Sequence, residues 1–98
     1  MKTKVRVSSQ VESFLKSLAP EPRRHLRLAM KGLGNNRGNT KRLEGTLSGY
    51  SRLRVAGFRV IYEERAERGV RVIGCVFVEH RPIVYELFLK MLEEDALG

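Results

Sequence analysis

The spacing of apolar residues divides the chain into a helical first part and a strand-rich second part. Residues 2–7 alternate between polar and apolar side chains, which is typical of a half-buried strand. Residues 9–33 carry apolar side chains three and four positions apart, interrupted at Pro20-Glu21-Pro22, which predicts two helices joined by a short turn. Their apolar faces consist of Val11, Phe14, Leu15 and Leu18, and of Leu26, Ala29, Met30 and Leu33.

After the loop that ends at Asn39, the spacing of apolar residues changes from that of helices to that of strands. Three strands are expected, over Tyr50–Val55, Phe58–Glu64 and Val70–Val78, followed by a closing helix over residues 84–92. The order β-α-α-β-β-β-α predicts an α+β fold, with two N-terminal helices packed on a small, mainly antiparallel sheet. We expect residues 1–98 to form one domain.

The distribution of charge indicates a polyanionic partner. The net charge is +8, and residues 1–62 hold 14 Lys and Arg against three Glu. Such a surface suits nucleic acid, an anionic membrane surface or an acidic protein. No apolar run approaches the ~20 residues that cross a bilayer. The single cysteine, Cys75, excludes an internal disulfide and is predicted to be buried. We therefore expect a cytoplasmic protein without a membrane partner.

Candidate chemistry gathers in two stretches of the strand-rich part. Arg52 and Arg54 share one strand face with Tyr50, so two guanidinium groups can bind successive phosphates while a ring stacks on a base. Further along, an apolar strand ends in His80-Arg81. A solvent-exposed strand face and a solvated histidine are the alternatives. Two isolated histidines and one cysteine predict no metal site, and neither a P-loop nor a nucleophile elbow is present.

These stretches resemble the RelE/ParE superfamily of toxins from type II toxin–antitoxin systems. The resemblance covers the order of elements along the whole chain and is carried in detail by residues 41–45, 47–54, 57–62 and 80–85. It favours the RelE-like branch and implies a RelE-like fold. It also implies a metal-independent endoribonuclease without a cofactor, which cleaves mRNA on the ribosome, inhibits translation and is neutralised by a cognate antitoxin.

The resemblance also suggests roles for individual residues. Arg59, Arg81 and Tyr85 match catalytic positions, and Arg52 and Arg54 stand where the best-known member has lysines. Lys41 and Tyr50 join Arg52 and Arg54 as expected RNA-binding residues. In the expected reaction the ribose 2′-OH attacks the adjacent phosphate, and Arg59 and Arg81 stabilise the charge that develops.

The general base stays open at this stage, because an arginine remains protonated at any working pH. Lys41, Glu44, His80 and Tyr85 are the candidates, and we favour His80 because histidine is the residue type that titrates nearest neutral pH. Two other functions also stay open. One is a ParE-like toxin that inhibits gyrase, and the other is a non-catalytic module that binds RNA or the ribosome.

Overall fold

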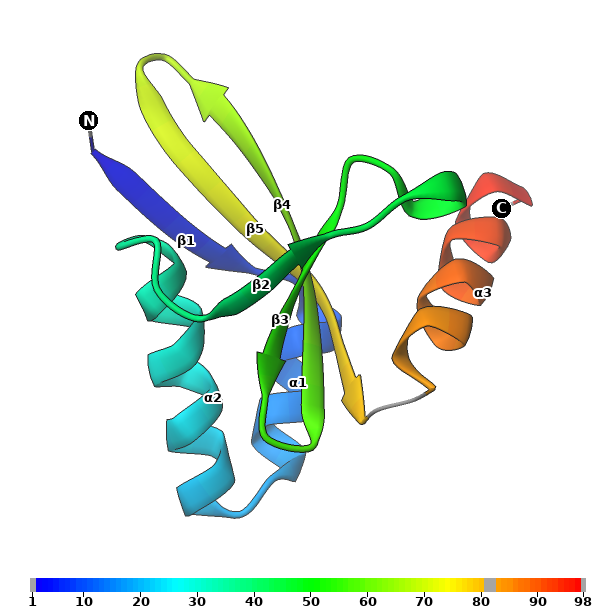
Figure 1. Cartoon of the computed structure of the whole chain (residues 1–98). Helices are drawn as coiled ribbons and strands as arrows, with labels where there is room; N and C mark the ends of the chain where they lie inside the picture. Colours follow the sequence, from blue (N-terminus) through cyan, green and yellow to red (C-terminus); the bar gives the residue numbers. More distant parts are fainter. Residues whose placement is uncertain (1, 81–82, 98) are drawn as a thin grey trace.

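The computed structural model describes residues 2–80 and 83–97, which form a five-stranded sheet and three α-helices (Figure 1). Side chains are described up to Ala96. In chain order the elements are β1 (Thr3–Val7), α1 (Ser9–Ser17), α2 (Pro20–Leu33), β2 (Asn39–Arg42), the 3₁₀ turn η1 (Gly45–Leu47), β3 (Ser51–Val55), β4 (Phe58–Glu67), β5 (Val70–His80) and α3 (Val84–Leu97).

The strands lie in the order β1-β5-β4-β3-β2, so that β1 and β2 are the two edges of the sheet. Strand β1 runs parallel to β5, and every other neighbouring pair is antiparallel. The long β4–β5 hairpin turns at Arg68 and Gly69, whose φ angles of 49° and 76° are those that a tight hairpin turn requires. A β-bulge shifts the register of this hairpin between Ile61 and Tyr62.

Each side of the sheet carries its own apolar cluster, because strand side chains alternate between the two faces. Helices α1 and α2 pack together on one side, here called the helix-pair face, over a core that includes Leu53, Val60 and Val78. Helix α3 packs with η1 on the opposite side, here called the α3 face, over a smaller cluster that includes Ile61 and Phe77. Figure 1 shows α3 well apart from the α1–α2 pair. The α3 face therefore carries less apolar cover than the helix-pair face.

Beyond the end of β1, side chains at the start of α1 form hydrogen bonds with the backbone of β5. The Ser8 hydroxyl donates to the Val76 carbonyl (2.8 Å) and accepts from the Val11 N–H at the helix N-terminus (3.3 Å). The Gln10 amide then takes the place of a strand residue. It donates to the Val78 carbonyl (2.9 Å) and accepts from the Val78 N–H (2.9 Å). These contacts fix the last part of β5, from which His80 projects.

We expect Gln10→Ala to lower the free energy of unfolding by about 2 kcal/mol, because both backbone groups of Val78 lose their partner in a part-buried site. Lys16→Ala, on the exposed side of the same helix, is the control. Chemical denaturation of the two variants measures the difference. Equal stability would show that water replaces the Gln10 amide without cost.

The α+β fold predicted from the sequence is confirmed, and the two N-terminal helices bury the apolar faces expected of them. One difference is strand β2, which the sequence pattern did not predict. All four of its residues are exposed and polar, so an edge strand of this kind leaves no apolar period to detect. Strands β4 and β5 also run further than expected, to Glu67 and His80. Within the described residues, no helix is both long and apolar enough to cross a membrane.

Candidate functional site

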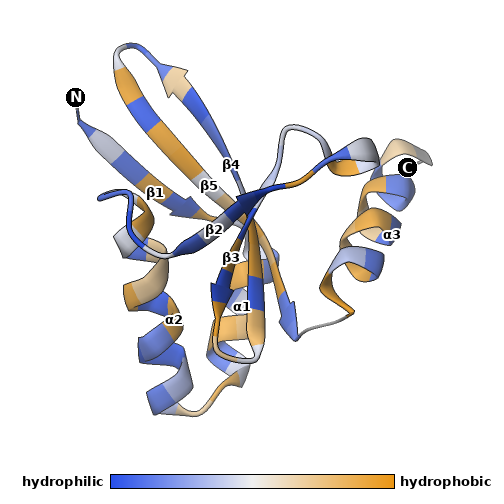
Figure 2. Ribbon diagram, viewed as in Figure 1, coloured by the Kyte–Doolittle hydropathy of each residue, from blue (hydrophilic) through white to orange (hydrophobic). Residues whose placement is uncertain are grey.

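The register of the sheet places a row of basic residues across the α3 face. Arg54 of β3 lies opposite Arg59 of β4, and one step along the strands Arg52 lies opposite Lys41 of β2. Opposed residues project to the same side of a sheet, and Arg59 alternates with Val60 of the helix-pair core. We call Lys41, Arg52, Arg54 and Arg59 the arginine face. Figure 2 shows β2 as a hydrophilic strand, and its Lys41 carries the basic surface to this edge of the sheet.

The two arginines of β3 are accessible to a ligand. Arg52 donates from Nη1 to the backbone and side-chain oxygens of Asn39 (3.1 and 3.4 Å), which orients its guanidinium along the sheet edge. Arg54 is exposed and forms no ion pair within residues 2–80 and 83–97. Arg54 and Arg59 lie directly opposite each other, so one anion between or above them would contact both guanidinium groups. The site is therefore suited to a phosphate.

Arg59 is the most buried charged residue of this face, with 4% of its surface exposed. Its Nη1 donates to the carbonyls of Ala56 (3.1 Å) and Phe58 (2.8 Å), and so holds the β3–β4 turn. The next carboxylates along β4 have arginine partners of their own: Arg65 pairs with Glu63, and Arg71 pairs with Glu64. Arg59 therefore combines a structural contact with a place beside Arg54.

A carboxylate that the sequence analysis did not select lies at the end of the same row. Glu79 of β5 is directly opposite Arg59, so it projects onto the α3 face. Glu79 is half-buried, and its Oε1 accepts from the backbone N–H of His80 (3.0 Å), which restrains the carboxylate. The row Arg54–Arg59–Glu79 thus places a carboxylate opposite one guanidinium, with a second guanidinium on the next strand.

His80 lies on the other side of the sheet from the arginine face. Its residue partner across the hairpin is Phe58, and its ring stands 4.8 Å from the Phe58 ring and 5.8 Å from that of Phe14 in α1. Phe14 and Phe58 both pack against the helix-pair core. The structure therefore does not bring His80 together with the arginines, and we do not retain it as the general base.

The remaining predicted site residues have different surroundings. Tyr50 packs its ring edge-on against Phe88 of α3, with ring centroids 5.0 Å apart, so this ring helps to hold α3 on the sheet. Tyr85, in the first turn of α3, is half-buried against the apolar cluster of the α3 face. Arg81 lies outside the described residues, and its role stays a prediction.

The basic residues of α2 are separate from this site. Arg23 donates to the carbonyls of Leu15 (3.0 Å) and Leu18 (2.8 Å) at the end of α1, and Arg27 pairs with Glu12 (3.3 Å). Both therefore join the two helices to each other. Since α2 covers the helix-pair face, its charges do not extend the arginine face.

Cys75 is buried in the helix-pair core, as predicted. Burial disfavours the thiolate and raises the pKa of Cys75 to about 12, so the thiol is unreactive at neutral pH. Nowhere in the described part of the chain do three or more His, Cys, Asp or Glu side chains form a group that could hold a metal ion.

Comparison with solved structures identifies the fold. The chain is similar to the toxin–antitoxin complex RelBE2 from Mycobacterium tuberculosis (24% identity, TM-score 0.67, covering 83% of this chain and 100% of that one). It is also similar to the RelB–RelE complex from Methanococcus jannaschii (19% identity, TM-score 0.59, covering 85% of this chain and 98% of that one). A third similar structure is a YoeB/ParE toxin from Agrobacterium tumefaciens (16% identity, TM-score 0.62, covering 83% of this chain and 99% of that one). The chain thus has the RelE-like fold. No protein-family model matches its sequence, and no curated protein does.

Proposed function

We propose that the chain is a RelE-superfamily toxin of a type II toxin–antitoxin system and acts as an endoribonuclease on ribosome-bound mRNA. The observation that carries this proposal is the row Arg54–Arg59–Glu79 on the α3 face of a RelE-like fold. Guanidinium groups bind phosphate through paired N–H donors, and a carboxylate beside them can accept a proton.

In the proposed reaction the ribose 2′-oxygen attacks the adjacent phosphorus while Glu79 takes the 2′ proton. Arg54 and Arg59 stabilise the added negative charge on the phosphorane oxygens. The bond from phosphorus to the 5′-oxygen then breaks, and Tyr85 donates its phenolic proton to that oxygen. The products are a 2′,3′-cyclic phosphate and a 5′-hydroxyl. Arg52 and Lys41 bind the neighbouring phosphates, and the ribosome holds the codon in position.

The proposal includes a protein partner that blocks the site. The similar structures from Mycobacterium tuberculosis and Methanococcus jannaschii are complexes of a toxin with an antitoxin. We propose that this chain likewise binds a cognate antitoxin in the cytoplasm, and that acidic side chains of the antitoxin face the excess of Lys and Arg in residues 1–62.

Cleavage can be tested directly with purified protein, ribosomes and a defined mRNA. We expect cuts within the codon in the ribosomal A site, with a cyclic phosphate on the upstream fragment, as mapped by primer extension and end-group analysis. The Glu79→Gln/Arg54→Ala double variant is the control for contaminating nucleases. Intact mRNA combined with inhibited DNA gyrase would instead support the ParE-like alternative. Intact mRNA with retained ribosome binding would support a non-catalytic module.

A further inference from the structure

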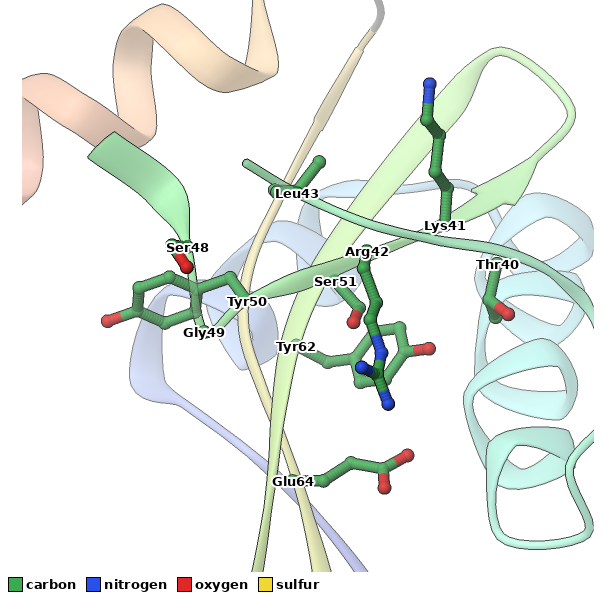
Figure 3. A pocket seen from close by; sticks show the side chains of 10 residues that line it. All are labelled: Thr40, Lys41, Arg42, Leu43, Ser48, Gly49, Tyr50, Ser51, Tyr62 and Glu64. Atoms are coloured by element: carbon green, nitrogen blue, oxygen red, sulfur yellow. The ribbon is translucent and has the colours of Figure 1, made fainter. Parts of the chain in front are cut away.

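A second polar surface lies just around the sheet edge from the arginine face. A cavity of about 560 Å³ opens between β2, β3, β4 and the loop that follows η1. Its walls carry a guanidinium, several hydroxyls and one carboxylate, shown in Figure 3, from Thr40, Arg42, Ser48, Ser51, Tyr62 and Glu64. Lys41 and Tyr50, which are expected to bind RNA, also line the cavity, whereas no binding role is predicted from the sequence for the six residues named above.

The cavity and the arginine face meet at strand β2. Arg42 lies opposite Ser51, which lies opposite Tyr62 of the helix-pair core, so Arg42 projects to the helix-pair side. The preceding residue, Lys41, lies opposite Arg52 on the arginine face. Figure 3 shows the Lys41 and Arg42 side chains pointing to opposite sides of the strand. The exposed edge strand therefore presents a cation on each of its two sides.

The charges in the cavity favour an anion. Glu64 is paired with Arg71 at 2.7 Å, so its negative charge is compensated from outside the cavity. Arg42 is exposed and forms no ion pair within the described ranges 2–80 and 83–97. The Ser51 hydroxyl lies on the residue opposite Arg42 and adds a neutral donor, and Ser48 adds another elsewhere on the cavity wall. One uncompensated guanidinium with hydroxyl donors is an arrangement that suits a phosphate group.

We propose that this cavity is a second phosphate-binding subsite for single-stranded RNA. A strand that leaves the arginine face bends around β2 and places a phosphate on Arg42. The inference rests on the proposed function, because it takes RNA as the ligand of the arginine face. A single strand is flexible enough to follow this edge, and phosphate contacts of this kind position a nucleic acid without reading its sequence.

The test uses binding rather than cleavage. Fluorescence anisotropy measures the affinity of the protein for a labelled 12-nucleotide RNA and for a trinucleotide, both with 2′-O-methyl sugars so that they cannot be cut. We expect Arg42→Gln to weaken binding of the 12-mer about tenfold. We also expect the slope of log K against log salt to flatten by about 0.7, the value for one phosphate contact on a single strand. Trinucleotide binding should be unchanged.

Arg68→Asn is the matched control, because it also replaces a guanidinium with an amide, at the distant tip of the β4–β5 hairpin, where asparagine tolerates the positive φ. Equal effects of Arg42→Gln and Arg68→Asn on the 12-mer would overturn the subsite, and so would an equal loss for the trinucleotide or no wild-type binding to the 12-mer. The proposed function is judged separately, by the ribosome cleavage assay. If the protein cleaves ribosome-bound mRNA but Arg42→Gln does not change RNA binding, only the proposed subsite is refuted.

Discussion

Replacing Glu79 with glutamine is expected to slow cleavage of ribosome-bound mRNA at least about 100-fold, the lower range for loss of a positioned general base. The amide keeps the shape of the side chain and can still accept from the His80 N–H, but it cannot take the 2′ proton. RNA affinity should not fall, because the change removes a negative charge from a basic surface. Single-turnover rates with saturating toxin measure the effect on the chemical step.

The pH profile separates a catalytic role from a positioning role. A carboxylate must be ionised to accept a proton, so the wild-type rate should decline in acid, and Glu79→Gln should lose that decline along with the rate. His80→Gln is the matched control from the neighbouring position, since its ring lies against Phe14 and Phe58 on the opposite side of the sheet. A full rate for Glu79→Gln, or loss of the acid limb in His80→Gln instead, would reverse our assignment.

The contrast between Glu79 and His80 shows where the sequence could not decide. Neighbouring residues of a strand face opposite sides, so the choice between them depends on which side β5 presents at its end. Phe77 and Val78 are both buried, one under α3 and the other under the helix pair. Because both faces of β5 are apolar here, the hydrophobic pattern alone does not show which side of the sheet Glu79 or His80 faces. The β-bulge at Ile61/Tyr62 further shifts the register that relates β4 to β5.

Other features were accessible from the sequence. The alternation Arg52-Leu53-Arg54-Val55 correctly predicted two arginines on one face, because Leu53 and Val55 are buried. The role that we propose for Arg42 depends on strand β2, whose four polar residues give no periodic signal in the sequence. The burial of Arg59 could not be anticipated either, since it depends on the carbonyls of a turn that its own guanidinium binds.

Arg54→Ala and Arg59→Ala are expected to reduce cleavage by similar factors, about 100-fold each, if both guanidiniums stabilise the phosphorane. Their effects on folding should differ. Arg54 is exposed, so its removal should leave the melting temperature nearly unchanged. Thermal denaturation monitored by circular dichroism, beside single-turnover cleavage, measures both quantities on each variant.

For Arg59→Ala we expect the same loss of rate together with a destabilisation of about 2 kcal/mol, because the carbonyls of Ala56 and Phe58 lose a buried, charged donor. In a domain of this size that lowers the melting temperature by roughly 10 °C. Arg59→Lys restores a positive charge without the planar fork, so it should recover part of the rate but little of the stability. A stable, fully active Arg59→Ala variant would remove Arg59 from the site, and a stable but inactive one would assign it to catalysis alone.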